Sequence, residues 1–181
     1  MTREKFVLFV GFPFYIKGVD ILVRAFEKIC NKFPEFTLKL IGHELEEEAK
    51  RYLKCWNKRV NFCKPVFYDE IIKEFLNCYC FVLPSREEGV ARVLIEAMSS
   101  GKPVIGSDRG GTPEIIKDGE CGFIFKGESV EDLASKLEIL LSDANLAKKM
   151  GEKGREIVKE RFSSEKYCEY FTEMIKNTLN D

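Results

Sequence analysis

The most constraining feature of this chain is residues 84–105, PSREEGVARVLIEAMSSGKPVI, a loop, a helix and a new strand in direct succession. The loop follows Cys80–Leu83, a short unbroken apolar run of the kind found in a strand buried on both faces of a parallel sheet. Gly101 lies where a helix C-terminal cap belongs. The apolar residues at helical spacing are Val90, Val93, Leu94, Ala97 and Met98. Parallel sheets bind ligands at the carboxyl ends of their strands, where the unpaired N–H groups that begin the next helix suit a phosphate.

Two carboxylates flank this predicted phosphate site. Glu88 lies in the loop just before the helix, and Glu96 lies within the helix. Because a carboxylate beside an anion site repels phosphate, its role there is to accept hydrogen bonds from hydroxyls, which sugars supply. The alternative is that Glu88 only complements the helix dipole and Glu96 is a solvated helix residue. This stretch alone leaves both interpretations open.

The whole stretch resembles the nucleotide-sugar-binding signature of GT-B glycosyltransferases of family 4, which are retaining enzymes. Their pattern is Pro-Ser, a Glu-Gly pair, a second Glu followed by Ala-Met, small residues, Gly and Pro-Val. The pattern continues in residues 107–123, SDRGGTPEIIKDGECGF, and the resemblance covers the chain from about Phe6 to Phe162. It implies the C-terminal, donor-binding half of a two-domain transferase, which takes a sugar from a GDP- or UDP-linked donor to a glycan or lipid-linked acceptor.

Length and charge limit the alternatives. The 181 residues suffice for one domain, spanning 1–181, with a sizeable core. The balance of 29 basic and 30 acidic residues offers no broad attraction to nucleic acid or to anionic lipid. No apolar run approaches the ~20 residues of a membrane helix, and residues 1–5 lack the apolar core of a signal peptide. We therefore expect a cytoplasmic protein, with membrane contact, if any, only through the missing acceptor-binding half.

The cysteines do not indicate a disulfide scaffold or a metal centre. There are seven of them, an odd number, no Cys-x-x-Cys pair occurs, and the chain has one histidine, His43. Buried reduced thiols are the favoured interpretation. No metal and no other cofactor is expected, which agrees with the metal-independent transfer that the resemblance implies.

Six predicted strands alternate with helices along the chain. This pattern predicts an α/β fold with a doubly wound parallel sheet of Rossmann type, in this case a single GT-B half-domain. The strands are expected at 6–10, 36–42, 60–63, 79–83, 103–106 and 122–125. Helices are expected from 19, at 44–58, at 68–77, in the signature, as a short helix with Thr112 as N-cap, and from 130 onward with breaks near 142–143 and 162–164. The Gly110-Gly111 pair before the short helix is expected to allow close backbone approach to a ligand, and the alternative is an ordinary tight turn. A dinucleotide oxidoreductase would share this fold, but the loop after Gly11 lacks the Gly-x-Gly-x-x-Gly fingerprint.

The first loop carries a lysine and a departure from the family pattern. The resemblance implies that Lys17, before Gly18, binds the donor diphosphate, whereas the alternative is an ordinary exposed lysine. The family has Gly-Arg where this chain has Gly11-Phe12, so one charge-assisted contact, worth roughly 1.5–3 kcal/mol, is missing. Arg92, in the first turn of the signature helix, is the candidate to replace that arginine, or it is simply solvated.

The remaining site residues are carried over from the resemblance. Glu88 is implied to bind hydroxyls of the transferred sugar, Glu96 those of the ribose, and the backbone at Val66 the nucleobase. The Gly-aromatic-Gly of the family is Gly89-Val90-Ala91 here, which leaves the geometry of the sugar contacts open. The implied donor-binding residues are Gly11, Lys17, Gly18, Val66, Glu88, Gly89, Val90, Ala91, Arg92, Val93, Leu94 and Glu96, with Lys17 and Glu88 as the catalytic residues. The alternative function is a non-catalytic nucleotide-sugar-binding subunit that acts with a separate acceptor domain.

Overall fold

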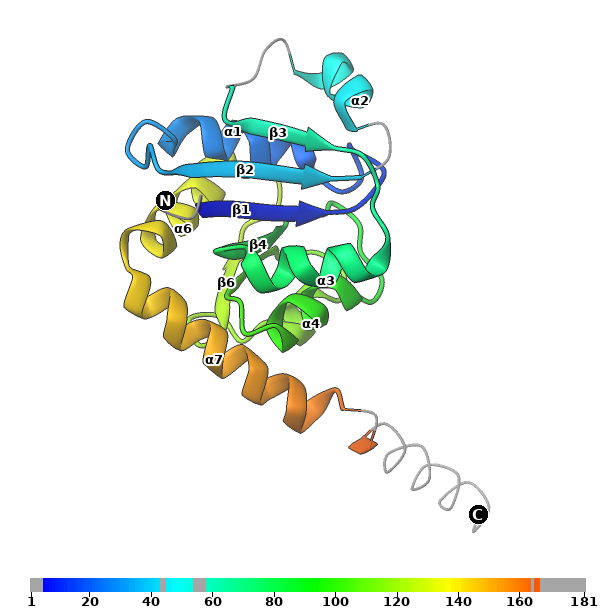
Figure 1. Cartoon of the computed structure of the whole chain (residues 1–181), viewed down its shortest axis with the longest axis vertical. Helices are drawn as coiled ribbons and strands as arrows, with labels where there is room; N and C mark the ends of the chain where they lie inside the picture. Colours follow the sequence, from blue (N-terminus) through cyan, green and yellow to red (C-terminus); the bar gives the residue numbers. More distant parts are fainter. Residues whose placement is uncertain (1–4, 43–44, 54–57, 164, 167–181) are drawn as a thin grey trace.

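A computed structural model describes residues 5–42, 45–53, 58–163 and 165–166, and its centre is one sheet of parallel strands (Figure 1). The strand order is β3-β2-β1-β4-β5-β6, and every pairing is parallel. The strands are β1 (Lys5–Val10), β2 (Phe36–Ile41), β3 (Val60–Cys63), β4 (Cys80–Leu83), β5 (Val104–Ser107) and β6 (Gly122–Phe125). The predicted doubly wound parallel sheet is therefore confirmed.

Helices cover both faces of this sheet. In Figure 1, α3 and α4 lie in front of the sheet, whereas α1 and α6 pack together behind it, and α7 runs along α4. Their bounds are α1 (Val19–Ile29), α2 (Leu45–Tyr52), α3 (Tyr68–Asn77), α4 (Arg92–Ser99), α5 (Thr112–Ile115), α6 (Val130–Ser142) and α7 (Ala144–Arg161). Because both faces are covered, all four residues of β4 are buried, as its unbroken apolar run predicts.

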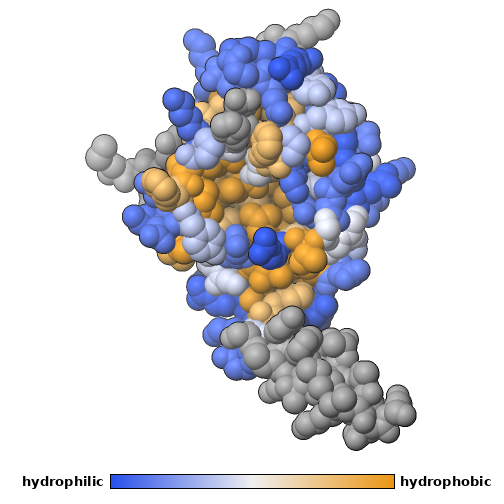
Figure 2. All heavy atoms as spheres, turned by 90° about the vertical axis from the view of Figure 1, so that its right-hand side faces the viewer, coloured by the Kyte–Doolittle hydropathy of each residue, from blue (hydrophilic) through white to orange (hydrophobic). Residues whose placement is uncertain are grey.

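The strand order reverses between β1 and β4, and this reversal positions the site. The chain leaves β1 for α1 behind the sheet and leaves β4 for α4 in front of it (Figure 1). In open parallel sheets, ligands bind at such a reversal, outside the carboxyl ends of the two strands. Figure 2 views the molecule from that edge. Apolar residues gather in a central hollow there, and hydrophilic residues surround it.

Two helices differ in their boundaries from the sequence prediction, and a third boundary agrees with it. The helix expected over 44–58 is α2, which ends at Tyr52; residues 43–44 and 54–57, with His43 among them, lie outside the described part. Thr112 was expected as an N-cap, and this was wrong by one position, because α5 begins at Thr112 and its buried hydroxyl has no hydrogen-bond partner. The long helical region does break where expected: Asp143 ends α6 and caps α7 by accepting from two backbone N–H groups.

None of the helices in the described ranges combines the length and the apolar character that crossing a bilayer requires.

Candidate functional site

A cleft of about 590 Å³ lies at the carboxyl ends of β1 and β4. It is formed by the end of β1, the β1–α1 loop (residues 11–18), the signature loop (residues 84–91), the start of α4, and one side chain from α3. The residues that line it are Val10, Gly11, Phe12, Lys17, Tyr68, Leu83, Glu88, Val90, Ala91, Arg92, Val93 and Glu96. The structure thus brings together eight of the twelve residues predicted from the sequence and adds four others.

Lys17 and Glu88 form an ion pair within the cleft. The Lys17 ammonium donates a hydrogen bond of 2.8 Å to Oε2 of Glu88, and the Ser85 hydroxyl donates to the same oxygen at 3.0 Å. The side chains are only 22% and 10% exposed, so the pair is partly shielded from water. An ammonium carries three N–H donors. Lys17 can therefore keep Glu88 as a partner and still donate to an anion in the cleft.

The β1–α1 loop reaches this position because it packs directly on the end of β4. Gly18 has a φ of +66°, and a Cβ atom there would lie 2.0 Å from the carbonyl oxygen of Pro84. The backbone N–H of Arg86 donates to the carbonyl oxygen of Ile16 at 2.8 Å. Gly18 does not line the cleft; its small size allows the close contact that sets the position of Lys17.

Arg86, which the sequence analysis did not identify, holds the two loops together. Its guanidinium donates to both carboxylate oxygens of Asp20, at 2.8 and 2.9 Å, and to the carbonyl oxygen of Tyr15 at 2.6 Å. It also lies 3.9 Å from the centre of the Tyr15 ring. Asp20 is only 4% exposed, and its hydrogen bonds raise the pKa of Arg86. The sequence signal for this pair was an aspartate beside the apolar face of α1.

The first turn of α4 opens into the cleft. No side chain caps this helix, whose N-cap residue is Ala91. The N–H of Arg92 donates to the carbonyl oxygen of Val90 at 2.8 Å, and that of Leu94 donates to the carbonyl oxygen of Ala91 at 2.9 Å. The N–H of Val93, which has no acceptor among the described residues, and the positive end of the dipole are thus available to an anion. Arg92 extends from the first helical residue along the cleft wall, and no carboxylate pairs with it in the described part of the chain. Leu94, predicted as a backbone ligand, has a fully buried side chain on the side of α4 that faces the core.

Glu96 lies one turn further along α4 and contacts α3. The hydroxyl of Tyr68 donates to Oε1 of Glu96 at 3.3 Å. The negative charge of Glu96 raises the pKa of this phenol, because ionising it would place two negative charges side by side. Tyr68 was missed in the sequence analysis; the available signal was an aromatic residue directly after the third strand and its exit loop.

The Gly110-Gly111 pair, expected to approach a ligand, instead supports the signature loop from behind. Gly110 has a φ of +56°, and a Cβ atom there would lie 2.0 Å from the carbonyl oxygen of Glu88. A Cβ atom on Gly111 would lie 2.4 Å from the carbonyl oxygen of Gly89. Side chains at either position would displace the loop that carries Glu88.

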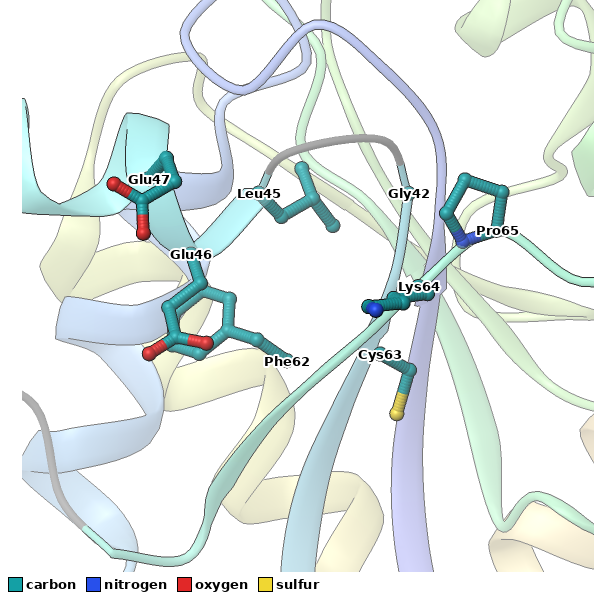
Figure 3. Close-up of a pocket in the computed structure, with 8 residues that line it drawn as sticks. All are labelled: Gly42, Leu45, Glu46, Glu47, Phe62, Cys63, Lys64 and Pro65. Carbon is teal, nitrogen blue, oxygen red and sulfur yellow. The ribbon is translucent and has the colours of Figure 1, made fainter.

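Gly89 and Val66 are not among the lining residues. Around Gly89, no atom lies within 4 Å of the position where a Cβ would be, so the space beside it is open. Val66 is 38% exposed and follows β3. The two residues before it line a second hollow of about 520 Å³ at the same sheet edge, between α2 and the end of β3 (Figure 3). Its lining residues are Gly42, Leu45, Glu46, Glu47, Phe62, Cys63, Lys64 and Pro65.

Within the described ranges, no three His, Cys, Asp or Glu side chains come together as metal ligands, and the thiols of Cys30, Cys63, Cys78, Cys80 and Cys121 form no disulfide. Burial raises the pKa of Cys78 to about 12. That thiol stays protonated at neutral pH, consistent with a role in packing.

A family model described as "Glycosyl transferases group 1" matches residues 1–157. The chain belongs to this glycosyltransferase family. It is 34% identical over 183 residues to an uncharacterized glycosyltransferase of Methanocaldococcus jannaschii, a match that covers 97% of this chain and 49% of that protein. It is 30% identical to the capsular polysaccharide biosynthesis glycosyltransferase CapM of Staphylococcus aureus, a match that covers 100% of this chain and 48% of that protein. The glycosyltransferase chain therefore spans about half the length of these curated relatives.

Solved structures support the same assignment. The sucrose-phosphate synthase of Thermosynechococcus elongatus superposes with a TM-score of 0.83 at 26% identity, covering 98% of this chain and 46% of that one. The C-terminal domain of LpcC, a group 1 glycosyl transferase of Francisella tularensis, superposes with a TM-score of 0.77 at 26% identity. The match covers 88% of this chain and 87% of that one. The chain is thus a GT-B glycosyltransferase domain of group 1.

Proposed function

We propose that this domain is the donor-binding half of a retaining glycosyltransferase that uses a GDP- or UDP-linked sugar. One observation carries the proposal: the cleft at the strand-order reversal combines an ammonium, a helix start without a side-chain cap, and two carboxylates. The first two features attract a diphosphate, and the carboxylates accept hydrogen bonds from hydroxyls on either side of it. A nucleotide sugar has this order of groups, with a ribose, two phosphates and then a sugar.

Each residue has a role in the proposed reaction. Lys17, the N–H group of Val93 and the positive end of the α4 dipole stabilise the negative charge that develops on the departing nucleoside diphosphate. Glu88, fixed by Lys17 and Ser85, accepts hydrogen bonds from the transferred sugar. Because these cations and dipoles are already aimed at the diphosphate, the proposed transfer needs no metal ion.

Glu96 is proposed to accept hydrogen bonds from the ribose hydroxyls. The backbone around Val66 is proposed to contact the nucleobase. The second hollow beside Lys64 and Pro65 lies along the same sheet edge, so there is space near this segment that a base can approach. The acceptor, a glycan or a lipid-linked glycan, is proposed to bind the other half of the enzyme; the name of the CapM relative, a capsular polysaccharide biosynthesis enzyme, supports a glycan.

Calorimetric titration with UDP, GDP and ADP, each with and without an attached sugar, tests this proposal. We expect one nucleoside diphosphate to bind measurably and Lys17→Ala to weaken it by roughly 10-fold or more, the value of one charge-assisted hydrogen bond. Lys149→Ala, which removes an exposed lysine of α7, serves as the charge-matched control. Absence of binding by all three nucleotides, or equal affinity of the Lys17→Ala and Lys149→Ala variants, would contradict the proposal.

The second candidate is a non-catalytic nucleotide-sugar-binding subunit that works with a separate acceptor-binding protein. It is supported by the close match to the LpcC C-terminal domain, 87% of which is covered, because that domain was solved on its own. The neighbouring coding sequence distinguishes the two: an upstream in-frame acceptor domain supports a two-domain enzyme, and a stop codon followed by a separate partner gene supports a subunit. For either candidate we propose a cytosolic location, which suits cysteines that form no disulfide among the described residues.

A further inference from the structure

Tyr68 is the one side chain of α3 that lines the cleft, and it is 60% exposed. Its position follows from the fold, because α3 begins at Tyr68 directly after the segment that leaves β3 at the ligand edge of the sheet. One end of the side chain is fixed: its hydroxyl donates to Oε1 of Glu96 at 3.3 Å. The aromatic ring therefore stands at the cleft wall with its position set by a hydrogen bond.

The same hydrogen bond determines how Glu96 presents its carboxylate. Oε1 accepts from Tyr68, whereas Oε2 has no protein donor within the described part of the chain. Glu96 is half-buried and lines the cleft, so this second oxygen is the one that remains available to a ligand. The phenol is a donor at neutral pH because the ordinary pKa of tyrosine is about 10, and the charge of Glu96 raises this pKa further.

We propose that Tyr68 is a positioning residue that orients Glu96 and thereby makes the site select ribonucleoside diphosphates over their 2′,3′-dideoxy counterparts. This inference rests on the proposed function, in which Glu96 binds the ribose. A carboxylate held at one oxygen can accept from the vicinal hydroxyls of a ribose with the rest of its lone pairs, and it loses those bonds when the hydroxyls are missing. The ring of Tyr68 supplies an apolar wall beside the same ribose, which contacts both kinds of ligand.

The test compares two ligands across a set of variants by calorimetry. The ligands are the nucleoside diphosphate that the domain binds best and its 2′,3′-dideoxy analogue. The variants are Tyr68→Phe, which keeps the ring and removes the hydroxyl, and Glu96→Gln, which keeps the shape and removes the charge. Tyr79→Phe is the matched control, because it removes a tyrosine hydroxyl that donates to the carbonyl oxygen of Leu140 at 3.2 Å, outside the cleft.

For the wild type we expect the ribonucleotide to bind roughly 10-fold or more tightly than the dideoxy analogue, since carboxylate hydrogen bonds are lost with the hydroxyls. Tyr68→Phe should lower ribonucleotide affinity by about 3- to 10-fold and leave dideoxy affinity nearly unchanged, because one neutral donor to Glu96 is lost. Glu96→Gln should remove most of the discrimination. Tyr79→Phe should match the wild type for both ligands.

The outcomes separate this inference from the proposed function. If Tyr68→Phe weakens both ligands equally, or neither, Tyr68 does not act through Glu96 on the ribose and the inference is overturned. Equal wild-type affinity for both ligands also overturns it, while the diphosphate site of the proposed function stands. If the wild type binds no nucleoside diphosphate at all, the proposed function and this inference fail together.

Discussion

The net charge of the cleft depends on Arg92. The charged residues that line it are Lys17, Arg92, Glu88 and Glu96, so the two cations balance the two carboxylates. Lys17 already pairs with Glu88, whereas Arg92 has no carboxylate partner among the described residues. Without Arg92 the cleft would carry a net negative charge and would repel both phosphates of a nucleotide sugar.

Replacing Arg92 should therefore weaken diphosphate binding, whereas replacing a lysine far from the cleft should not. We expect Arg92→Leu to lower nucleoside diphosphate affinity by roughly 3- to 10-fold. The effect is smaller than that of a buried charge, because Arg92 is exposed and water screens it. The unphosphorylated nucleoside should be unaffected. Lys149→Leu, which removes the same charge from an exposed position on α7, is the control, and equal losses for the two variants would count against a specific role of Arg92.

Phe12 offers a complementary gain-of-function experiment on the same cleft. It lines the cleft beside Gly11, at the position where the family pattern that the sequence resembles has an arginine. In the Arg92→Leu background, Phe12→Arg should restore most of the lost diphosphate affinity, because it returns one cation to the same space. Calorimetry of the double variant measures this directly, and an affinity no better than that of Arg92→Leu would contradict the charge argument.

At the scale of elements, the cleft depends on how the β1–α1 loop is held against the signature loop. A bidentate ion pair joins Arg86 of the signature loop to Asp20 in α1, and Arg86 also binds the backbone at Tyr15. On the other side, the ring of Tyr52 in α2 stacks on Phe14 and Tyr15, with centroids 5.6 and 5.0 Å apart. Lys17 lies between these two anchors, so its position is a property of three elements rather than of the loop alone.

Breaking this ion pair should destabilise the whole domain. Arg86→Leu leaves a 4% exposed carboxylate without its cation, which should lower the free energy of unfolding by about 3 kcal/mol. Arg109→Leu is the matched control, because the Arg109–Asp108 pair is 55% and 42% exposed and should be worth less than about 1 kcal/mol. Urea unfolding of both variants measures the two free energies of unfolding. The slopes of free energy against urea concentration are compared between the variants. Equal stability of the two variants would show that the buried pair is not an anchor.

At the scale of the whole molecule, the sequence predicts the sheet better than it predicts the cleft. Apolar runs followed by glycine or proline are local signals, and they located all six strands. The signature motif also placed Glu88 and Glu96 correctly at the cleft. Tyr68 and Arg86 were not predicted, because their roles arise from contacts with residues 28 and 66 positions away in the chain. The glycine pair was assigned to the ligand, since the sequence does not reveal which backbone Gly110 approaches.

The domain spans about half the length of its curated relatives, and the proposed mechanism makes a prediction about the isolated chain. The cleft holds groups that stabilise a leaving diphosphate, and in the proposed mechanism the other half supplies the acceptor site and the second wall that excludes water from the sugar. We therefore expect the purified chain to release no nucleoside diphosphate from UDP-glucose, UDP-N-acetylglucosamine or GDP-mannose above the level of a Lys17→Ala/Glu88→Gln variant. Fusing it to the remaining half of the Methanocaldococcus jannaschii relative, in place of the matched half, should raise that release. Turnover by the isolated chain that the double substitution abolishes would instead show that this half performs the transfer alone.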